Sequence, residues 1–318
     1  MRLRGIDFGN VFIASGTLNF FGEGWRHHKA LRMLPGFDFT GATFVSKTTT
    51  WPSREGNMKL RDDLQPMELF PDCIRVYPLE NVVLNAVGLS GPGARALFWR
   101  YKWDLRKEPF LISFMAAGAT REDRLREVQS FANDFAWISP GFMAPVGIEL
   151  NISCPNIGRD KLLFILSEAS DQLGILSDLD VPIVLKINAL APIERVEELA
   201  EKGLFDAVTV SNTIPWGALP ERIDWKGIFG TDVSPLARYG GGGLSGAPLL
   251  PIVADWVYEA SDKLSVPIIA GGGVLSKSGV DLLYDAGAHA IMIGSVAILR
   301  PWSVQGIIRH TNKVFESR

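Results

Sequence analysis

The sequence predicts an α/β fold, a (β/α)8 barrel of the TIM-barrel type. Short, continuous apolar runs recur along the chain, as expected for strands that are covered on both faces. Stretches with helical spacing of apolar residues separate these runs, and no low-complexity tract, charge block or linker divides the chain. We therefore expect one domain over residues 1–318, and an open doubly wound sheet is the alternative with the same local pattern.

Eight runs are expected to form the parallel strands of the barrel. All of them are short and apolar for most of their length, which is typical of strands in a buried parallel sheet. The expected strands cover residues 11–15, 43–47, 110–115, 146–151, 182–187, 207–212, 267–270 and 290–293.

Five stretches between these runs are expected to form helices. Residues 193–202, for example, follow Pro192 and end before Gly203, which are start and stop signals for a helix. The expected helices cover residues 121–135, 160–176, 193–202, 248–263 and 276–286.

Two segments are longer than a connection in a simple barrel requires. Residues 48–109 separate the second and third expected strands, and residues 213–247 separate the sixth strand from its helix. Because barrel active sites are built from the loops at the carboxyl ends of the strands, we expect both insertions to form lids and walls of an active site.

The composition excludes several classes of protein. The chain has 32 Lys and Arg against 35 Asp and Glu, a formal net charge of −3, so no electrostatic footprint for nucleic acid or for an anionic membrane is present. Two cysteines, Cys73 and Cys154, cannot build a disulfide framework. No apolar run approaches the roughly 20 residues of a spanning helix, and the first residues contain no apolar run long enough to be expected as a signal peptide. We expect a soluble, cytoplasmic protein.

Glycines cluster where the last two expected strands end. Gly271, Gly272 and Gly273 follow the seventh strand, and Gly294 with Ser295 follows the eighth. These strand ends are neighbours in a barrel, and glycine lets peptide N–H groups approach an anion closely. Each cluster alone would be read as a tight turn, but together they predict a phosphate site. A phosphorylated substrate and a phosphate-bearing cofactor such as FMN both remain open.

Two lysines stand where the strands would bury them. Lys47 closes the second run, where it is either an exposed cap or a group that fixes an anion in the barrel mouth. Lys186 lies inside the fifth run, and a charge there needs a partner because burying it alone is very unfavourable. A salt-bridged lysine and a ligand-binding lysine are equally compatible with the sequence.

Four asparagines can converge on the same mouth. Asn85, Asn151, Asn156 and Asn212 lie at or just after expected strand ends, or in the first insertion. Their amides supply donors and acceptors that suit a small planar ligand rich in C=O and N–H groups, such as a pyrimidine. Turn formation is the alternative role for each of them taken singly.

Cys154, in the loop after the fourth strand, is a candidate base or nucleophile, although a buried apolar cysteine is the commoner role. Cys73 is assigned to that commoner role. His27 and His28 are adjacent and therefore point to different faces of a regular element, so no metal site is expected.

The ordered set of motifs resembles the dihydroorotate dehydrogenase family. The similarity runs from about residue 10 to residue 300, and it is the order of many short motifs that makes it specific. The motifs are Ala14-Ser15-Gly16, Ser46-Lys47-Thr48, Arg54-Glu55-Gly56-Asn57, Asn85 through Gly88-Leu89, Asn151-Ile152-Ser153-Cys154-Pro155-Asn156, Asn212-Thr213, Gly243-Leu244-Ser245-Gly246, Gly271-Gly272-Gly273 and Gly294-Ser295.

The resemblance implies a barrel that uses FMN to oxidise (S)-dihydroorotate to orotate in pyrimidine biosynthesis. The flavin ring would be surrounded by Ala14, Ser15, Gly16, Lys47, Thr48 and Lys186, with Asn151 between the ring and the substrate. The FMN phosphate would be held by Gly246, Gly272, Gly273, Gly294 and Ser295. The orotate pocket would be formed by Lys47, Asn85, Val87, Gly88, Leu89, Asn151, Asn156, Asn212 and Thr213.

The same resemblance implies chemical roles. Cys154 would be the base that takes a proton from dihydroorotate, and Lys47 would hold the substrate carboxylate. Lys186 would stabilise negative charge on the reduced flavin. A cysteine at this position resembles the soluble class of the family. Fumarate, or NAD reached through a separate iron–sulfur flavoprotein subunit, would be the acceptor, and a homodimer is expected.

Some features depart from the family pattern. The segment from residue 20 to residue 39 is longer and more aromatic than expected, and Ser90 with Gly91 stands where an asparagine is expected. A related flavin oxidoreductase acting on another dihydropyrimidine or cyclic amide is therefore an alternative function. A non-catalytic flavin-binding subunit is another.

Overall fold

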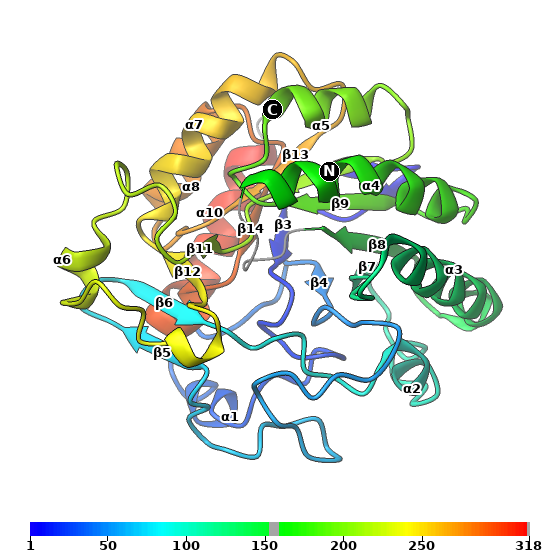
Figure 1. Ribbon diagram of the computed structural model, residues 1–318. Helices are drawn as coiled ribbons and strands as arrows, with labels where there is room; N and C mark the ends of the chain where they lie inside the picture. The colour runs from blue at the N-terminus through cyan, green and yellow to red at the C-terminus, as the bar shows by residue number, and fades with distance from the viewer. Residues whose placement is uncertain (153–158, 317–318) are drawn as a thin grey trace.

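The computed structural model describes residues 1–152 and 159–316, and its centre is a barrel of eight parallel strands (Figure 1). In the order in which they pair, the strands are β3 (Val11–Ile13), β14 (Ala290–Ile293), β13 (Ile268–Gly271), β10 (Ala207–Val210), β9 (Ile183–Ile187), β8 (Val146–Asn151), β7 (Phe110–Phe114) and β4 (Phe44–Val45). The barrel closes between β3 and β4, where the Ile13 N–H donates to the Thr43 carbonyl at 2.9 Å. All eight expected strands are confirmed, within a few residues of their predicted ends.

The five expected helices are also confirmed. They are α3 (Arg121–Ile138), α4 (Arg159–Ser177), α5 (Ile193–Ala200), α7 (Leu249–Ser261) and α8 (Lys277–Asp285). The sequence explains α3 well, because Thr120 and Asp123 form a reciprocal capping box and its buried face packs on β7, with the rings of Phe131 and Phe114 stacked at 4.1 Å.

Several helices were not predicted. The longest is α10 (Val304–Glu316), which follows β14 and packs on α8, with Val304, Ile307 and Ile308 buried. The first two strands are followed only by short helices, α1 (His28–Leu31) and α2 (Ala94–Phe98). Two further short helices are α6 (Trp225–Phe229) and α9 (Val296–Leu299).

The barrel interior is layered. A hairpin of β1 (Arg2–Leu3) and β2 (Ile6–Asp7) closes its amino end, where Leu3 and Phe8 join an apolar cluster with inward-facing strand residues. Leu111 and Val184 belong to that cluster, and two residues further along the same strands come the buried polar Ser113 and Lys186. Because side chains alternate along a strand, residues two apart face the same side. The polar layer therefore lies directly above the apolar one, toward the carboxyl ends of the strands.

The two long insertions pair with each other across the barrel mouth. They form an antiparallel sheet in the order β11 (Ile214–Pro215), β12 (Gly243–Gly246), β6 (Val82–Asn85) and β5 (Ile74–Tyr77), seen on the left of Figure 1 with β5 and β6 in cyan. In register, Gly243 lies opposite Asn85 and Gly246 opposite Val82. The insertions were expected as walls of the site, but their pairing was not predicted.

No helix within residues 1–152 and 159–316 combines the length and the apolar character needed to cross a bilayer.

Gly246 is expected to be needed for the pairing of the two insertions. Its φ is +116°, and a Cβ added there would lie 2.2 Å from the Asn81 carbonyl oxygen. Gly246→Ala should therefore lower the free energy of unfolding, measured by urea denaturation, by about 1–3 kcal/mol because it adds backbone strain and a clash. The control is Gly306→Ala in α10, where a Cβ meets nothing within 4 Å and should be neutral or stabilising. Equal effects of the two substitutions would contradict the prediction.

Candidate active site

A cavity of about 490 Å³ lies between the carboxyl ends of the barrel strands and the sheet formed by the insertions. Its volume is within the range of roughly 300–1,000 Å³ that is usual for small-molecule sites. This position is where barrels of this type place their active sites.

Most of the residues that the sequence singled out meet in this cavity. Lining it are Ala14, Ser15, Gly16, Lys47, Thr48, Asn85, Val87, Gly88, Leu89, Asn151, Lys186, Asn212, Thr213, Gly272, Gly273, Gly294 and Ser295. Cys154 and Asn156 lie outside the described residues. Gly246 does not line the cavity, but its carbonyl oxygen lies 2.4 Å from the position that a Cβ on Gly273 would take, so it packs against the cavity wall from behind.

One end of the cavity is built from peptide groups of two neighbouring strand ends. None of the hydrogen bonds found within the described residues uses the N–H of Gly272, Gly273, Gly294 or Ser295 as donor. A side chain would not fit there, since a Cβ on Gly294 would lie 2.9 Å from the Cβ of Ala14. Unpaired N–H groups that line a cavity are a binding site for an anion such as a phosphate.

Lys47 provides a second anion-binding feature. Its side chain is buried, its ammonium donates to the Ser90 carbonyl at 2.5 Å, and the ring of Phe20 lies under it with the centroid 4.9 Å from Nζ. Burial lowers the pKa of Lys47 to about 8. Within the described part of the chain no carboxylate lies at ion-pair distance from this ammonium. The ammonium is therefore available to an anionic ligand.

Peptide N–H groups next to Lys47 add to this feature. The N–H groups of Val87, Gly88 and Leu89 serve as donors in none of the hydrogen bonds between described residues. Gly88 and Leu89 both have positive φ, +74° and +61°. Successive peptide N–H groups in a turn can point into one concavity, which suits a carboxylate. Lys47 and these three peptide groups form what we call the carboxylate cradle.

Ser90 holds the carboxylate cradle together. Its hydroxyl donates to the Val87 carbonyl at 3.0 Å and accepts from the Met58 N–H at 3.1 Å, so it ties the segment after β6 to the segment around Gly56. A Cβ on Gly56 would lie 2.3 Å from the Ser90 hydroxyl, which shows how closely the two segments approach. The departure from the family pattern at this position therefore has a structural role.

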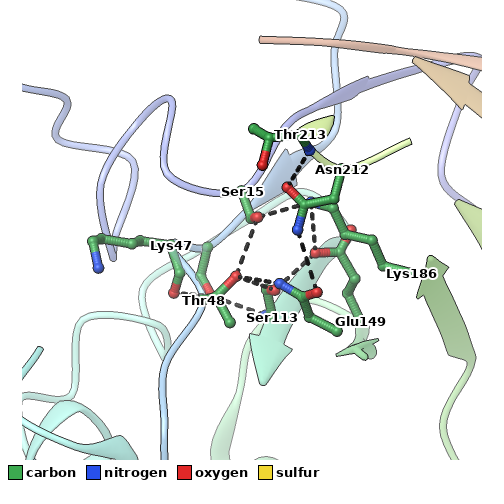
Figure 2. A network of polar contacts seen from close by, with 10 residues as sticks. Ser15, Lys47, Thr48, Ser113, Glu149, Lys186, Asn212 and Thr213 are labelled. Carbon is green, nitrogen blue, oxygen red and sulfur yellow. Dashed lines mark hydrogen bonds and ion pairs between the residues drawn. The ribbon is translucent and has the colours of Figure 1, made fainter. Parts of the chain in front are cut away.

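The polar floor of the cavity is a connected network (Figure 2). The Asn151 amide donates to the Thr48 hydroxyl at 3.2 Å, and the Asn212 amide reaches the Asn151 oxygen at 3.5 Å. Lys186 donates to Ser15 at 2.9 Å and pairs with Glu149 at 3.4 Å. Lys186 is therefore salt-bridged, and it also lines the cavity, where its role in binding a ligand stays a prediction.

Sequence reasoning assigned no role to Glu149 and Ser113, which complete this floor. Figure 2 shows both inside the network, while the Lys47 ammonium points away from it. A signal existed, because Glu149 is a charged residue in the middle of an otherwise apolar run and alternates in phase with Asn151.

The long first loop contributes a wall of the cavity. Residues 25–28 line it, and the Trp25 indole N–H donates to the Gly16 carbonyl at 2.8 Å. Burial lowers the pKa of His28 to about 3, so this side chain is neutral at physiological pH and packs as a ring against Phe37. Among the described residues no group of three or more His, Cys, Asp and Glu is placed to hold a metal ion.

Comparisons with known protein families and curated proteins all point to dihydroorotate dehydrogenases. The family model for dihydroorotate dehydrogenase matches residues 1–315. A similar curated protein is the catalytic subunit of dihydroorotate dehydrogenase B (NAD(+)) of Anoxybacillus flavithermus, 30% identical over 97% of this chain and 88% of the relative. Dihydroorotate dehydrogenase A (fumarate) of Lactobacillus delbrueckii subsp. bulgaricus is 28% identical over 93% of this chain and 86% of the relative.

Among solved structures, the fold is similar to that of DHODH from Eimeria tenella in complex with ferulenol. The TM-score is 0.65 at 17% identity, with 99% of this chain and 84% of the other covered. At this level of identity the similarity concerns the fold.

Lys47 is expected to lower the stability of the ligand-free protein. Because burial disfavours its charged form, Lys47→Met should raise the free energy of unfolding at pH 7 by about 1–3 kcal/mol. The gain should shrink between pH 8 and pH 10. In this range Lys47 has released its proton in the folded protein but still binds it in the unfolded chain. The free energy of unfolding of the unchanged protein therefore rises with pH and approaches that of Lys47→Met. Urea denaturation at pH 7 and 9.5 measures both effects.

The control for this prediction is Lys59→Met, because Lys59 is exposed and pairs with Glu55 on the surface. Its effect should stay within about 0.5 kcal/mol. The prediction fails if Lys47→Met destabilises the protein more than Lys59→Met does at pH 7.

Proposed function

Because the chain belongs to the dihydroorotate dehydrogenase family, we propose that it uses FMN to oxidise (S)-dihydroorotate to orotate. The observation that carries the proposal is that one cavity contains two separate anion-binding features. One is the set of unpaired peptide N–H groups after β13 and β14, and the other is the carboxylate cradle around Lys47. A flavin phosphate and a substrate carboxylate need such a pair of sites.

The residues at the β13 and β14 ends fit the phosphate of FMN. They offer peptide N–H donors and too little room for side chains, as a closely bound phosphate requires. Ser15, Thr48, Asn151 and Lys186 would lie against the isoalloxazine ring, since they form the polar floor of the same cavity. When bound, FMN supplies the acceptor for a hydride.

The carboxylate cradle fits the substrate. Dihydroorotate carries one carboxylate, which the Lys47 ammonium and the N–H groups of Val87, Gly88 and Leu89 would bind. Asn85, Asn212 and Thr213, which line the same cavity, would read the C=O and N–H groups of the pyrimidine edge. These contacts fix the ring in one orientation, with the two carbons that lose hydrogen held in place.

We assign the proton transfer to Cys154. The reaction removes a proton from one ring carbon and a hydride from the next, so a base and a hydride acceptor are both needed. The thiolate of Cys154 would take the proton onto Sγ, and a free cysteine pKa of about 8.5 allows this near neutral pH. This assignment rests on the motif in which Cys154 stands.

Oxidation of another cyclic amide is the second candidate function. The buried ammonium of Lys47 argues against an uncharged dihydropyrimidine, because it would remain buried without an anion. A non-catalytic subunit would have no need for this unfavourable group.

We further propose that the electrons leave through a partner subunit. Several similar proteins, including those of Anoxybacillus flavithermus and Endomicrobium trichonymphae, are named catalytic subunits of an NAD(+)-linked enzyme, while another is named for fumarate. Steady-state oxidation of dihydroorotate by the purified chain with fumarate, and with NAD alone, distinguishes these cases. Turnover with fumarate would argue against the need for a partner. We also propose that the catalytic chain forms a homodimer.

The first prediction from this function concerns the visible spectrum. The purified protein should show a flavin spectrum that bleaches when dihydroorotate is added without oxygen. Cys154→Ala should keep the flavin but bleach at least a hundredfold more slowly, since general-base catalysis contributes about 10²–10⁴-fold. A flavin that stays oxidised with dihydroorotate would contradict the proposed substrate, and unchanged bleaching by Cys154→Ala would remove its role as base.

The second prediction concerns orotate binding. The Kd for orotate, from the perturbation of the flavin spectrum, should rise between pH 7 and pH 9, because Lys47 with a pKa of about 8 loses the charge that holds the carboxylate. Lys47→Gln should raise the Kd at pH 7 by about 10–100-fold, the loss expected for a charge-assisted hydrogen bond. It should also remove the part of the pH dependence that belongs to this residue. The same pH dependence in both proteins would exclude Lys47 as its origin.

A further inference from the structure

Five polar side chains close a ring of contacts beneath the cavity (Figure 2). They come from five neighbouring strands or the residues just after them. The contacts are Lys186 Nζ to Ser15 Oγ at 2.9 Å, Ser15 Oγ to Thr48 Oγ1 at 3.2 Å, Thr48 Oγ1 to Ser113 Oγ at 2.9 Å, Ser113 Oγ to Glu149 Oε1 at 2.7 Å, and Glu149 Oε1 back to Lys186 Nζ at 3.4 Å.

Two members of this ring do not reach the cavity. Ser15, Thr48 and Lys186 line it, whereas Ser113 and Glu149 have no exposed surface and do not. The proposed function therefore gives direct contacts to three of the five residues and leaves the charge of Glu149 without a role.

A purely structural role does not account for Glu149. Its second oxygen, Oε2, has no hydrogen-bond partner among the described residues, and the buried hydroxyl of Thr209, opposite Lys186 in the sheet, has none there either. A carboxylate that is buried and only half satisfied lowers stability relative to an apolar side chain. The apolar layer just below, with Val184 and Leu111, shows that this part of the barrel can be filled without charge.

The geometry instead couples Glu149 to Lys186. An ammonium has three donors, of which Lys186 gives one to Ser15 and one, over a long 3.4 Å, to Glu149. Glu149 thus holds the ammonium at the cavity floor, and its negative charge opposes the positive charge that Lys186 presents to a ligand. In a buried site this opposition is poorly screened.

We propose that Glu149 is a positioning residue that holds Lys186 against the flavin ring and limits the positive potential that the ring experiences. The proposal rests on the proposed function, because it needs a flavin above Lys186. Limiting this potential disfavours extra negative charge on the ring, so the bound flavin has a lower reduction potential and passes its electrons on more readily.

The test is the affinity of the FMN-loaded protein for sulfite. Sulfite adds reversibly to the flavin N5 and leaves negative charge on the ring, so its Kd, read from the loss of visible absorbance, reports the potential around the ring without turnover. Glu149→Gln keeps the size of the side chain and removes the charge, and it should lower the sulfite Kd by about tenfold. The reduction potential of the flavin should rise with it.

Three further variants separate electrostatics from packing. Thr209→Val removes an uncharged group from the same layer and should leave the sulfite Kd within twofold of the unchanged protein. In a Lys186→Met background, the effect of Glu149→Gln should be smaller, because the part that acts through the position of Lys186 is then absent. Ser113→Ala removes the hydroxyl that donates to Glu149 at 2.7 Å, so the negative charge of Glu149 is less compensated. The sulfite Kd should then rise two- to threefold. This variant tests the proposal even if Glu149→Gln does not fold.

The outcomes separate this proposal from the function on which it rests. A protein that binds no FMN overturns both. Other results overturn the role of Glu149 alone, in a protein that binds FMN and bleaches with dihydroorotate. One is that Glu149→Gln leaves the sulfite Kd and the reduction potential unchanged. The other is that Thr209→Val changes both as much as Glu149→Gln does.

Discussion

Two lysine ammonium groups are buried at the mouth of the barrel, and the need to compensate their charge constrains the structure around them. Lys186 meets this need inside the protein, through Glu149 and Ser15. Lys47 meets it only in part, through the Ser90 carbonyl and the ring of Phe20. The two ammonium groups therefore differ in how far the protein compensates their charge. An incompletely compensated ammonium, such as that of Lys47, gains more from binding an anion.

The pairing of the two insertions turns these charges into a site. Alone, the barrel mouth would be an open polar surface in which water screens Lys47 and Lys186. The sheet formed by β5, β6, β11 and β12 roofs the mouth and brings Asn85 and the carboxylate cradle over the strand ends. Where such a roof reduces the access of water, the electrostatic contacts below it become stronger.

Much of this arrangement could be predicted from the sequence. The eight strands follow from their apolar runs, and the polar residues placed after them, such as Lys47, Asn151 and Gly272, were correctly expected at one end of the barrel. The helix α10 was not predicted although a signal existed, because Val304, Ile307 and Ile308 stand at the i, i+3, i+4 spacing of a helix with one buried face. Glu149 was not predicted because the candidate residues were taken mainly from the ends of the apolar runs, whereas Glu149 lies within one.

The sequence by itself determined the order of the elements and the face on which each strand residue lies, because these depend on local periodicity and on turn residues close in the chain. Only the tertiary structure decided which buried groups meet. The contact of Lys186 with Glu149 joins residues 37 positions apart, and that of Thr48 with Ser113 joins residues 65 positions apart. Such contacts depend on the relative shift of neighbouring strands when the barrel closes, and on the pairing of two insertions that are distant in the chain. Both are set by the packing of the whole molecule, so no local pattern contains them.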